Sequence, residues 1–146
     1  MCIYNSLVLD PITKDLAFPI PLFQRLRNMP LNSDKVQGGA FFNETLLHKN
    51  IIKKIGYPFR EFFIGGDERE YYYRALRNGI NCYTILESSF IHPAPKRAKV
   101  KLLWKTMEIS MGPPWKLYYK TRNAINTAKL HFDTIGKIKV IIKYGL

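Results

Sequence analysis

The chain has 146 residues, which fits one domain or part of one. Apolar residues make up 47%, enough for a core, and the charged fraction of 23% argues against a disordered chain. The net charge is +12, from 23 Lys and Arg against 11 Asp and Glu. This balance favours an anionic partner, which could be nucleic acid, lipid headgroups or a phosphorylated substrate.

Several patterns indicate a cellular location. No apolar run reaches the roughly 18–20 residues of a transmembrane helix. Residues 1–5 lack the basic leader and apolar core of a signal peptide. The two cysteines, Cys2 and Cys82, fit free thiols in a reducing compartment. We therefore expect a cytoplasmic protein.

The first third of the chain predicts little regular structure. Residues 3–9 are typical of a short strand, whereas four prolines make 10–37 irregular. Residues 38–42 predict a glycine turn that leads into a short buried strand. A helix is predicted over 44–55, with Asn43 as its N-cap and Gly56 as its C-cap.

An acidic stretch follows an apolar run. Gly66 precedes Asp67 and Glu68, and Glu70 comes two residues later. A helix is predicted from Asp67 to about residue 79, which puts these acids in its first turn, where the helix dipole favours negative charge. The acids are either a solvated helix start or catalytic groups at a cleft. Arg74 lies four residues after Glu70, a spacing that predicts an ion pair.

The rest of the chain alternates strand and helix patterns. Strands are predicted over 81–86 and 89–93, and residues 95–101 are basic. A long helix is predicted from Pro113-Pro114 to about residue 131, followed by a basic and apolar tail over 137–146. His48 and His131 are predicted on helix surfaces.

Five segments in this order resemble the C-terminal half of a family 2 glycosyltransferase, nearest to its galactofuranosyl- and rhamnosyltransferase-like members. They cover about residues 38–125. The segments are Gly38-Gly39-Ala40-Phe41-Phe42, residues 55–64, Gly66-Asp67-Glu68-Arg69-Glu70-Tyr71 with Arg74, Ser89-Phe90-Ile91-His92, and Tyr118-Tyr119-Lys120-Thr121-Arg122-Asn123.

The resemblance implies an α/β fold, namely the C-terminal half of the mixed sheet of a GT-A (Rossmann-like) fold with flanking helices. Three segments are expected. Residues 1–37 would be an irregular segment continuing from a nucleotide-binding half, 38–93 the acceptor and catalytic half, and 94–146 a basic helical extension. The Asp-x-Asp metal motif of the family's first half does not occur in this sequence. We therefore expect a truncated or split enzyme that needs a separate N-terminal half.

The resemblance also implies a reaction. A sugar would pass from a nucleotide-sugar donor to a saccharide or lipid-linked acceptor with inversion. Glu68 would be the catalytic base and Asp67 its neighbour, and His92 would belong to a Mn²⁺ or Mg²⁺ site completed by the donor half. The residues expected to bind substrate are Gly38, Gly39, Ala40, Phe41, Gly66 and Arg74.

The basic C-terminal third allows a second hypothesis, a non-catalytic module. Its Lys and Arg residues are interleaved with Trp, Tyr, Leu and Ile, a pattern that suits an anionic membrane surface, here the inner face of the membrane. The same pattern could bind single-stranded nucleic acid, but no nucleic-acid module is recognisable, so we do not expect that partner. A solvated basic face is the remaining alternative.

Overall fold

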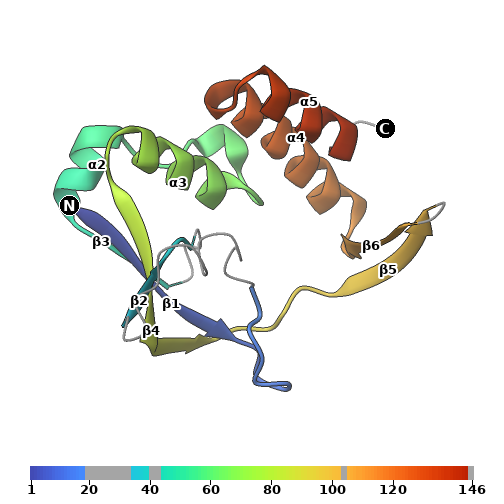
Figure 1. The fold of residues 1–146 in the computed structure, drawn as a ribbon, viewed down its shortest axis with the longest axis horizontal. Coiled ribbons are helices and arrows are strands. Elements are labelled where there is room, and N and C mark those ends of the chain that lie inside the picture. Colours follow the sequence, from blue (N-terminus) through green and yellow to red (C-terminus); the bar gives the residue numbers. More distant parts are fainter. Residues whose placement is uncertain (19–33, 40–43, 103–104, 145–146) are drawn as a thin grey trace.

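The computed structural model describes residues 1–18, 34–39, 44–102 and 105–144, which form a mixed α/β structure (Figure 1). Its elements in chain order are β1 (Cys2–Leu9), β2 (Lys35–Gln37), β3 (Thr45–Leu47), α2 (Lys49–Ile55), the 3-10 helix η2 (Arg60–Phe62), α3 (Asp67–Arg77), β4 (Asn81–Ile91), β5 (Arg97–Leu102), β6 (Lys105–Ser110), α4 (Pro114–His131) and α5 (Thr134–Tyr144).

Four strands form a mixed sheet in the order β2-β4-β1-β3. The two long strands, β1 and β4, run parallel, and Ile3 pairs with Cys82. The short strands β3 and β2 pair antiparallel with β1 and β4. A register shift between Ser6 and Leu7 interrupts the parallel pairing. A parallel pair needs a long crossover connection, and here α2 and α3 lie within it.

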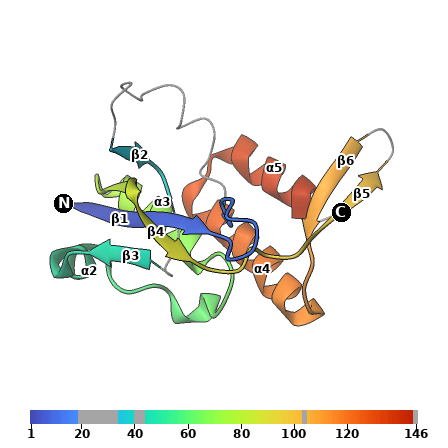
Figure 2. The same cartoon turned by 90° about the horizontal axis from the view of Figure 1, so that it is seen from below.

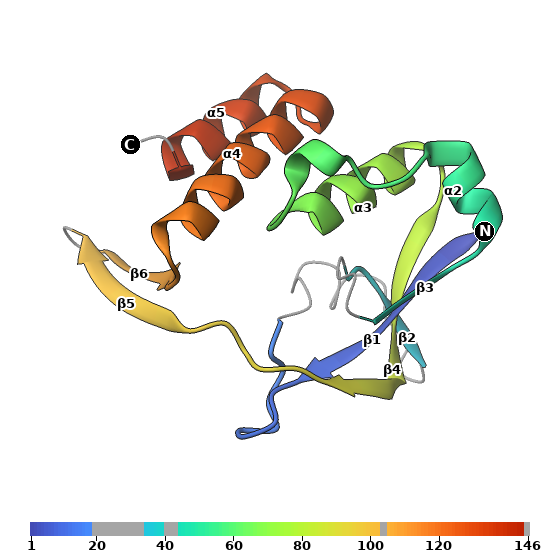
Figure 3. The same cartoon turned by 180° about the vertical axis from the view of Figure 1, so that it is seen from behind.

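The core lies between the sheet and helices α2 and α3, which lie on the same side of it (Figure 3). Ile3 and Cys82 contribute from the sheet, Ile51 from α2, and Tyr71 and Ala75 from α3, all at most 4% exposed. Ile51 and Ile55 of α2, and Tyr71 and Ala75 of α3, are each four residues apart, so each pair lies on one face of its helix and packs in the core.

The C-terminal part contains a strand hairpin and a helix hairpin. β5 and β6 pair antiparallel from Arg97 with Ser110 to Leu102 with Lys105. Helices α4 and α5 lie side by side, and the strand hairpin extends at the same end of the molecule as the C-terminal end of α5 (Figures 1 and 2). Among the described helices, none is both long and apolar enough to cross a membrane.

The prediction of one helix over 44–55 is wrong in its first part. Thr45–Leu47 is a strand, β3, and the helix begins only at Lys49. Leu47 stands four residues before Ile51, a helical spacing that favoured the longer helix. It pairs instead with Ile3 of β1 and packs against the core from the sheet. His48 caps α2, because its Nδ1 accepts a hydrogen bond from the Asn50 N–H at 3.2 Å. The predicted N-cap, Asn43, lies outside the described residues.

Other predicted elements also differ from those in the structure. Lys35–Gln37 forms β2 inside the segment expected to be irregular, and residues 81–91 form one continuous strand, β4. The segment 94–146 is not wholly helical, because its basic start is strand β5 of a hairpin. The predictions of a strand over 3–9, a helix from Asp67 and a helix ending at His131 are confirmed. The tail over 137–146 mostly belongs to α5.

Candidate active site

The acid pair, Asp67 and Glu68, lies in the first turn of α3 because the chain bends sharply just before it. Gly66 is the N-cap in the left-handed region, with φ of 100°, and Gly65 has φ of 74°. A side chain would strain the backbone there. The Gly66 N–H donates to Glu68 Oε2 at 3.3 Å. The two glycines thus place both acids at the positive end of the helix dipole.

Burial and the neighbouring acid change the acidity of Glu68. Burial disfavours the charged carboxylate, and the hydrogen bond and negative charge of Asp67 act in the same direction. Together they raise the pKa of Glu68 to about 7, from an ordinary value of 4.5, although backbone N–H groups partly oppose the shift. A carboxyl group that titrates near neutral pH is suited to accept a proton from a substrate.

The segment before the acid pair is held by Asn123, a fully buried residue of α4. Its side-chain amide nitrogen donates to the carbonyls of Phe62 at 2.7 Å, Ile64 at 3.1 Å and Gly65 at 3.0 Å. Its Oδ1 accepts from Nε and Nη2 of Arg122, at 3.1 and 2.9 Å. One side chain of α4 therefore fixes the backbone that delivers Asp67 and Glu68.

A buried ionic cluster lies one turn further along α3. Glu70 is 1% exposed, and Arg74 donates to both of its oxygens, at 3.1 and 2.6 Å, which confirms the predicted pair. Arg74 Nη1 also donates to the carbonyls of Ile55 and Tyr57, at 2.7 and 3.0 Å. His131 Nε2 lies 3.0 Å from Glu70 Oε1, so the prediction that His131 is a surface residue is wrong. The cluster joins α2, α3 and α4.

Gly38 and Gly39 pack against the two central strands. The Thr84 hydroxyl donates to the Gly38 carbonyl at 2.9 Å. Gly39 has φ of 104°, and a Cβ there would lie 2.5 Å from Thr84 Oγ1 and 3.1 Å from Asn5 Nδ2. Only glycine fits this contact without a shift of its neighbours. Ala40 and Phe41, the other residues expected to line the acceptor site, lie outside the described residues.

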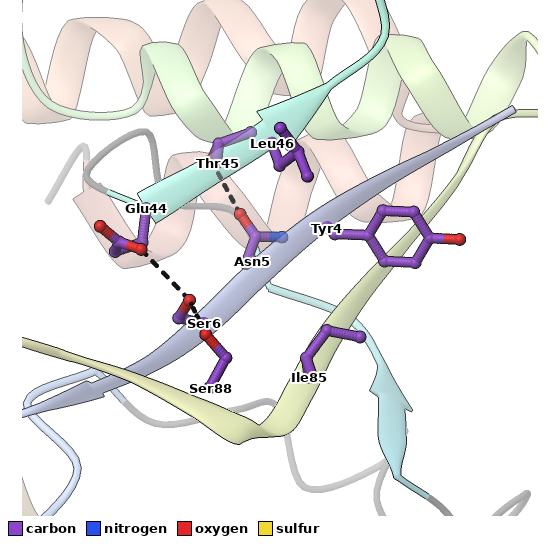
Figure 4. A pocket seen from close by; sticks show the side chains of 8 residues that line it. All are labelled: Tyr4, Asn5, Ser6, Glu44, Thr45, Leu46, Ile85 and Ser88. Carbon is purple, nitrogen blue, oxygen red and sulfur yellow. Dashed lines mark hydrogen bonds between the residues drawn. The ribbon is translucent and has the colours of Figure 1, made fainter.

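A pocket of about 410 Å³ lies over β1, β3 and β4 (Figure 4). Ser6 Oγ donates to Glu44 Oε2 at 3.2 Å and lies 2.7 Å from Ser88 Oγ, and Thr45 Oγ1 donates to Asn5 Oδ1 at 2.8 Å. None of the acids of α3 lines it. The lining residues are Tyr4, Asn5, Ser6, Glu44, Thr45, Leu46, Ile85 and Ser88.

His92 follows the last residue of β4. Its backbone N–H donates to the Leu9 carbonyl at 2.9 Å, its Nδ1 lies 2.8 Å from the Pro93 carbonyl, and its ring packs 5.8 Å from that of Phe18. A proton on Nδ1 would leave Nε2 free to bind a metal, as is common for histidine ligands. Within the described ranges, however, no three His, Cys, Asp or Glu side chains gather as a metal site.

Sequence reasoning missed the roles of two residues. Asn123 belongs to a segment that carried the family resemblance, but nothing in its neighbours signals that it holds Phe62, which is 61 residues away. His131 stands in a polar helix end, and its partner Glu70 is also 61 residues away. Both contacts arise because α4 packs beside α3, which helical periodicity alone does not determine.

Comparison with known proteins points to the class of glycosyltransferases. Two relatives, the galactofuranosyltransferase GlfT1 of Mycobacterium tuberculosis strain CDC 1551 / Oshkosh and that of strain ATCC 25618 / H37Rv, are each 29% identical to the chain over 116 residues. The match covers 74% of this chain but only 38% of each relative, so the chain spans well under half of their length. No family model and no solved structure matches the chain.

Proposed function

We propose that this chain supplies the acceptor-activating part of an inverting glycosyltransferase, which moves a sugar from a nucleotide-sugar donor to a saccharide or lipid-linked acceptor. One observation carries the proposal, namely the acid pair at the start of α3, in which Glu68 has a pKa of about 7. The similarity of the chain to a galactofuranosyltransferase supports it. The GT-A fold of family 2 is part of the same proposal.

Glu68 is the base in this mechanism. An acceptor hydroxyl becomes a better nucleophile when a carboxylate takes its proton as it attacks the anomeric carbon. The hydrogen bond from the Gly66 N–H and the contact with Asp67 keep the Glu68 carboxylate in one orientation. Asp67 orients the sugar or acceptor hydroxyls. In the same proposal Gly66, directly before the acids, and Gly38 and Gly39 bind substrate.

The family resemblance predicts that Arg74 binds substrate, whereas in this proposal it has a supporting role. Its guanidinium is engaged by Glu70 and by the carbonyls of Ile55 and Tyr57. It therefore supports the site by holding α2 to α3, and direct contact of Arg74 with substrate stays an untested prediction.

His92 could hold a divalent cation through Nε2, together with ligands from a nucleotide-binding half. Bound there, Mn²⁺ or Mg²⁺ would neutralise charge on the departing diphosphate. A single histidine is a poor site for these ions, which prefer oxygen ligands. In this proposal the metal therefore binds only when the nucleotide-binding half supplies the other ligands.

The test combines donor binding with turnover. Calorimetry with Mn²⁺ and a panel of nucleotide-sugars, including a galactofuranosyl donor, measures binding to the chain alone and to the chain with an added nucleotide-binding half. Release of nucleoside diphosphate measures turnover. We expect Glu68→Gln to lower kcat at least about 100-fold, while Glu87→Gln, a change at an exposed carboxylate of β4, leaves it unaltered.

Two results would contradict the proposal. One is turnover by Glu68→Gln within twofold of the unmodified chain. The other is the absence of donor binding and turnover in both preparations. The dependence of kcat/KM on pH adds a further check, because an ionised base requires the rate to rise through about pH 7.

A further inference from the structure

Helix α5 exposes a stripe of four isoleucines. Ile135, Ile138, Ile141 and Ile142 are 64%, 50%, 52% and 60% exposed, and none of the residues of α5 is buried. Their spacing of three, three and one places them on one side of a helix. An apolar stripe of this kind is costly in water and indicates a surface that is covered in the working protein.

The opposite side of α5 is the one that packs on the protein. Gly136 and Val140 are half-buried, and a Cβ on Gly136 would lie 2.9 Å from Phe132 Cβ. Asp133 fixes the turn between α4 and α5, because its Oδ1 accepts from the Gly136 N–H at 2.8 Å. The helix is thus anchored with its isoleucines turned outward.

Positive charges flank the isoleucine stripe. Lys139 and Lys143, four residues apart and both exposed, lie along one side of it, and Lys137 lies along the other. No acidic residue occurs within Thr134–Tyr144. The β5–β6 hairpin, whose first strand is basic, lies at the same end of the molecule (Figures 1 and 2).

We propose that α5 binds an anionic lipid surface, lying in the plane of the interface with its isoleucines inserted and its lysines among the headgroups. Eleven residues of helix span about 16 Å, about half the thickness of a bilayer core, so α5 lies on the membrane and does not cross it. Apolar residues on one side and lysines at its margins are the composition of interfacial helices. This inference is independent of the proposed transferase chemistry.

Lipid fits this surface better than other occupants. A second copy packed on the stripe would bring Lys139 and Lys143 near the same lysines of its partner, and like charges oppose such contact. Single-stranded nucleic acid gains much of its affinity from stacking on aromatic rings, which isoleucines lack. An anionic bilayer would bury the isoleucines in its apolar region and place the lysines beside its negatively charged headgroups.

Vesicle flotation with the full chain tests this inference. The vesicles contain either phosphatidylcholine alone or phosphatidylcholine with about 30% phosphatidylglycerol, an anionic lipid. We expect binding to the anionic vesicles only. Lys139→Gln with Lys143→Gln should weaken it about thirtyfold, because each cation near the surface contributes about fivefold. Ile138→Asn with Ile142→Asn should abolish it.

Matched variants serve as controls. Lys49→Gln with Lys53→Gln removes two exposed lysines at the same spacing on α2, and Ile12→Asn changes an isoleucine that is 88% exposed. Both should bind like the unmodified chain, and far-UV circular dichroism checks that every variant is folded. Equal losses in the α5 and control variants would overturn the inference. So would a dimer that Ile138→Asn with Ile142→Asn dissociates, or binding to single-stranded DNA without binding to vesicles.

Discussion

The side-chain amide nitrogen of Asn123 lies 2.7 Å from the Phe62 carbonyl oxygen, and this hydrogen bond attaches α4 to the segment that leads into the acid pair. The adjacent Arg122 donates to the Glu61 carbonyl, so two consecutive residues of α4 hold the same segment. The acids of α3 therefore owe their position to a helix about 50 residues further along the chain.

Replacing Asn123 by alanine should destabilise the protein by about 2 to 3 kcal/mol, because it removes one donor from the Phe62 carbonyl and the amide donor from the part-buried carbonyls of Ile64 and Gly65. Chemical denaturation measures the change. Asn126→Ala, at a half-buried residue of the same helix, is the control and should cost less. The role assigned to Asn123 is wrong if the two variants have the same free energy of unfolding.

The buried cluster around Glu70 gives a second prediction. Glu70→Ala should cost about 3 to 5 kcal/mol, because it leaves the Arg74 guanidinium enclosed without its carboxylate partner. Urea unfolding measures the loss, with Arg69→Ala, at an exposed position of the same helix, as the control. A cost for Glu70→Ala no greater than that for Arg69→Ala would show that the cluster contributes little to stability.

The elements that sequence reasoning predicted well are those with local signals. Helix α3 has two glycines before it and three acids in its first turn, and α4 begins at a proline pair. Such signals are set by residues adjacent in the chain, so they can be read without tertiary structure. The acid pair was found at the start of α3 for the same reason.

The elements that were mispredicted depend on pairing between distant segments. Leu47 stands at helical spacing from Ile51, yet Thr45–Leu47 is a strand because Leu47 pairs with Ile3. The basic residues from Arg97 to Leu102 form a strand because they pair with Lys105–Ser110. Likewise, His131 is held by Glu70 across 61 residues, a contact that no local pattern reports.

Gly39 provides a third prediction. Gly39→Ala should destabilise by about 3 kcal/mol or more, since the new Cβ would collide with Thr84 Oγ1 and the backbone stays in the left-handed region. Gly79→Ala is a matched control, because Gly79 has φ of 73° but has nothing within 4 Å of a Cβ. It should cost about 1 kcal/mol. Thermal unfolding compares them, and equal costs would mean that packing against Thr84 does not restrict Gly39.

Glu68 gives the last prediction, which concerns pH. The pKa of Glu68 is about 7 in the folded protein and near 4.5 when exposed, so the folded state holds the proton more tightly between these values. Its contribution to stability is therefore fully present below about pH 4.5 and is lost as the pH rises through about 7.

Glu68→Gln cannot ionise and should be more stable than the unmodified chain at pH 8, by on the order of 1 to 3 kcal/mol, but not at pH 4. Denaturation at both pH values tests this, with Glu87→Gln as the control that should show no such difference. A gain for Glu68→Gln that is equal at pH 4 and pH 8 would exclude titration of this carboxyl as its cause.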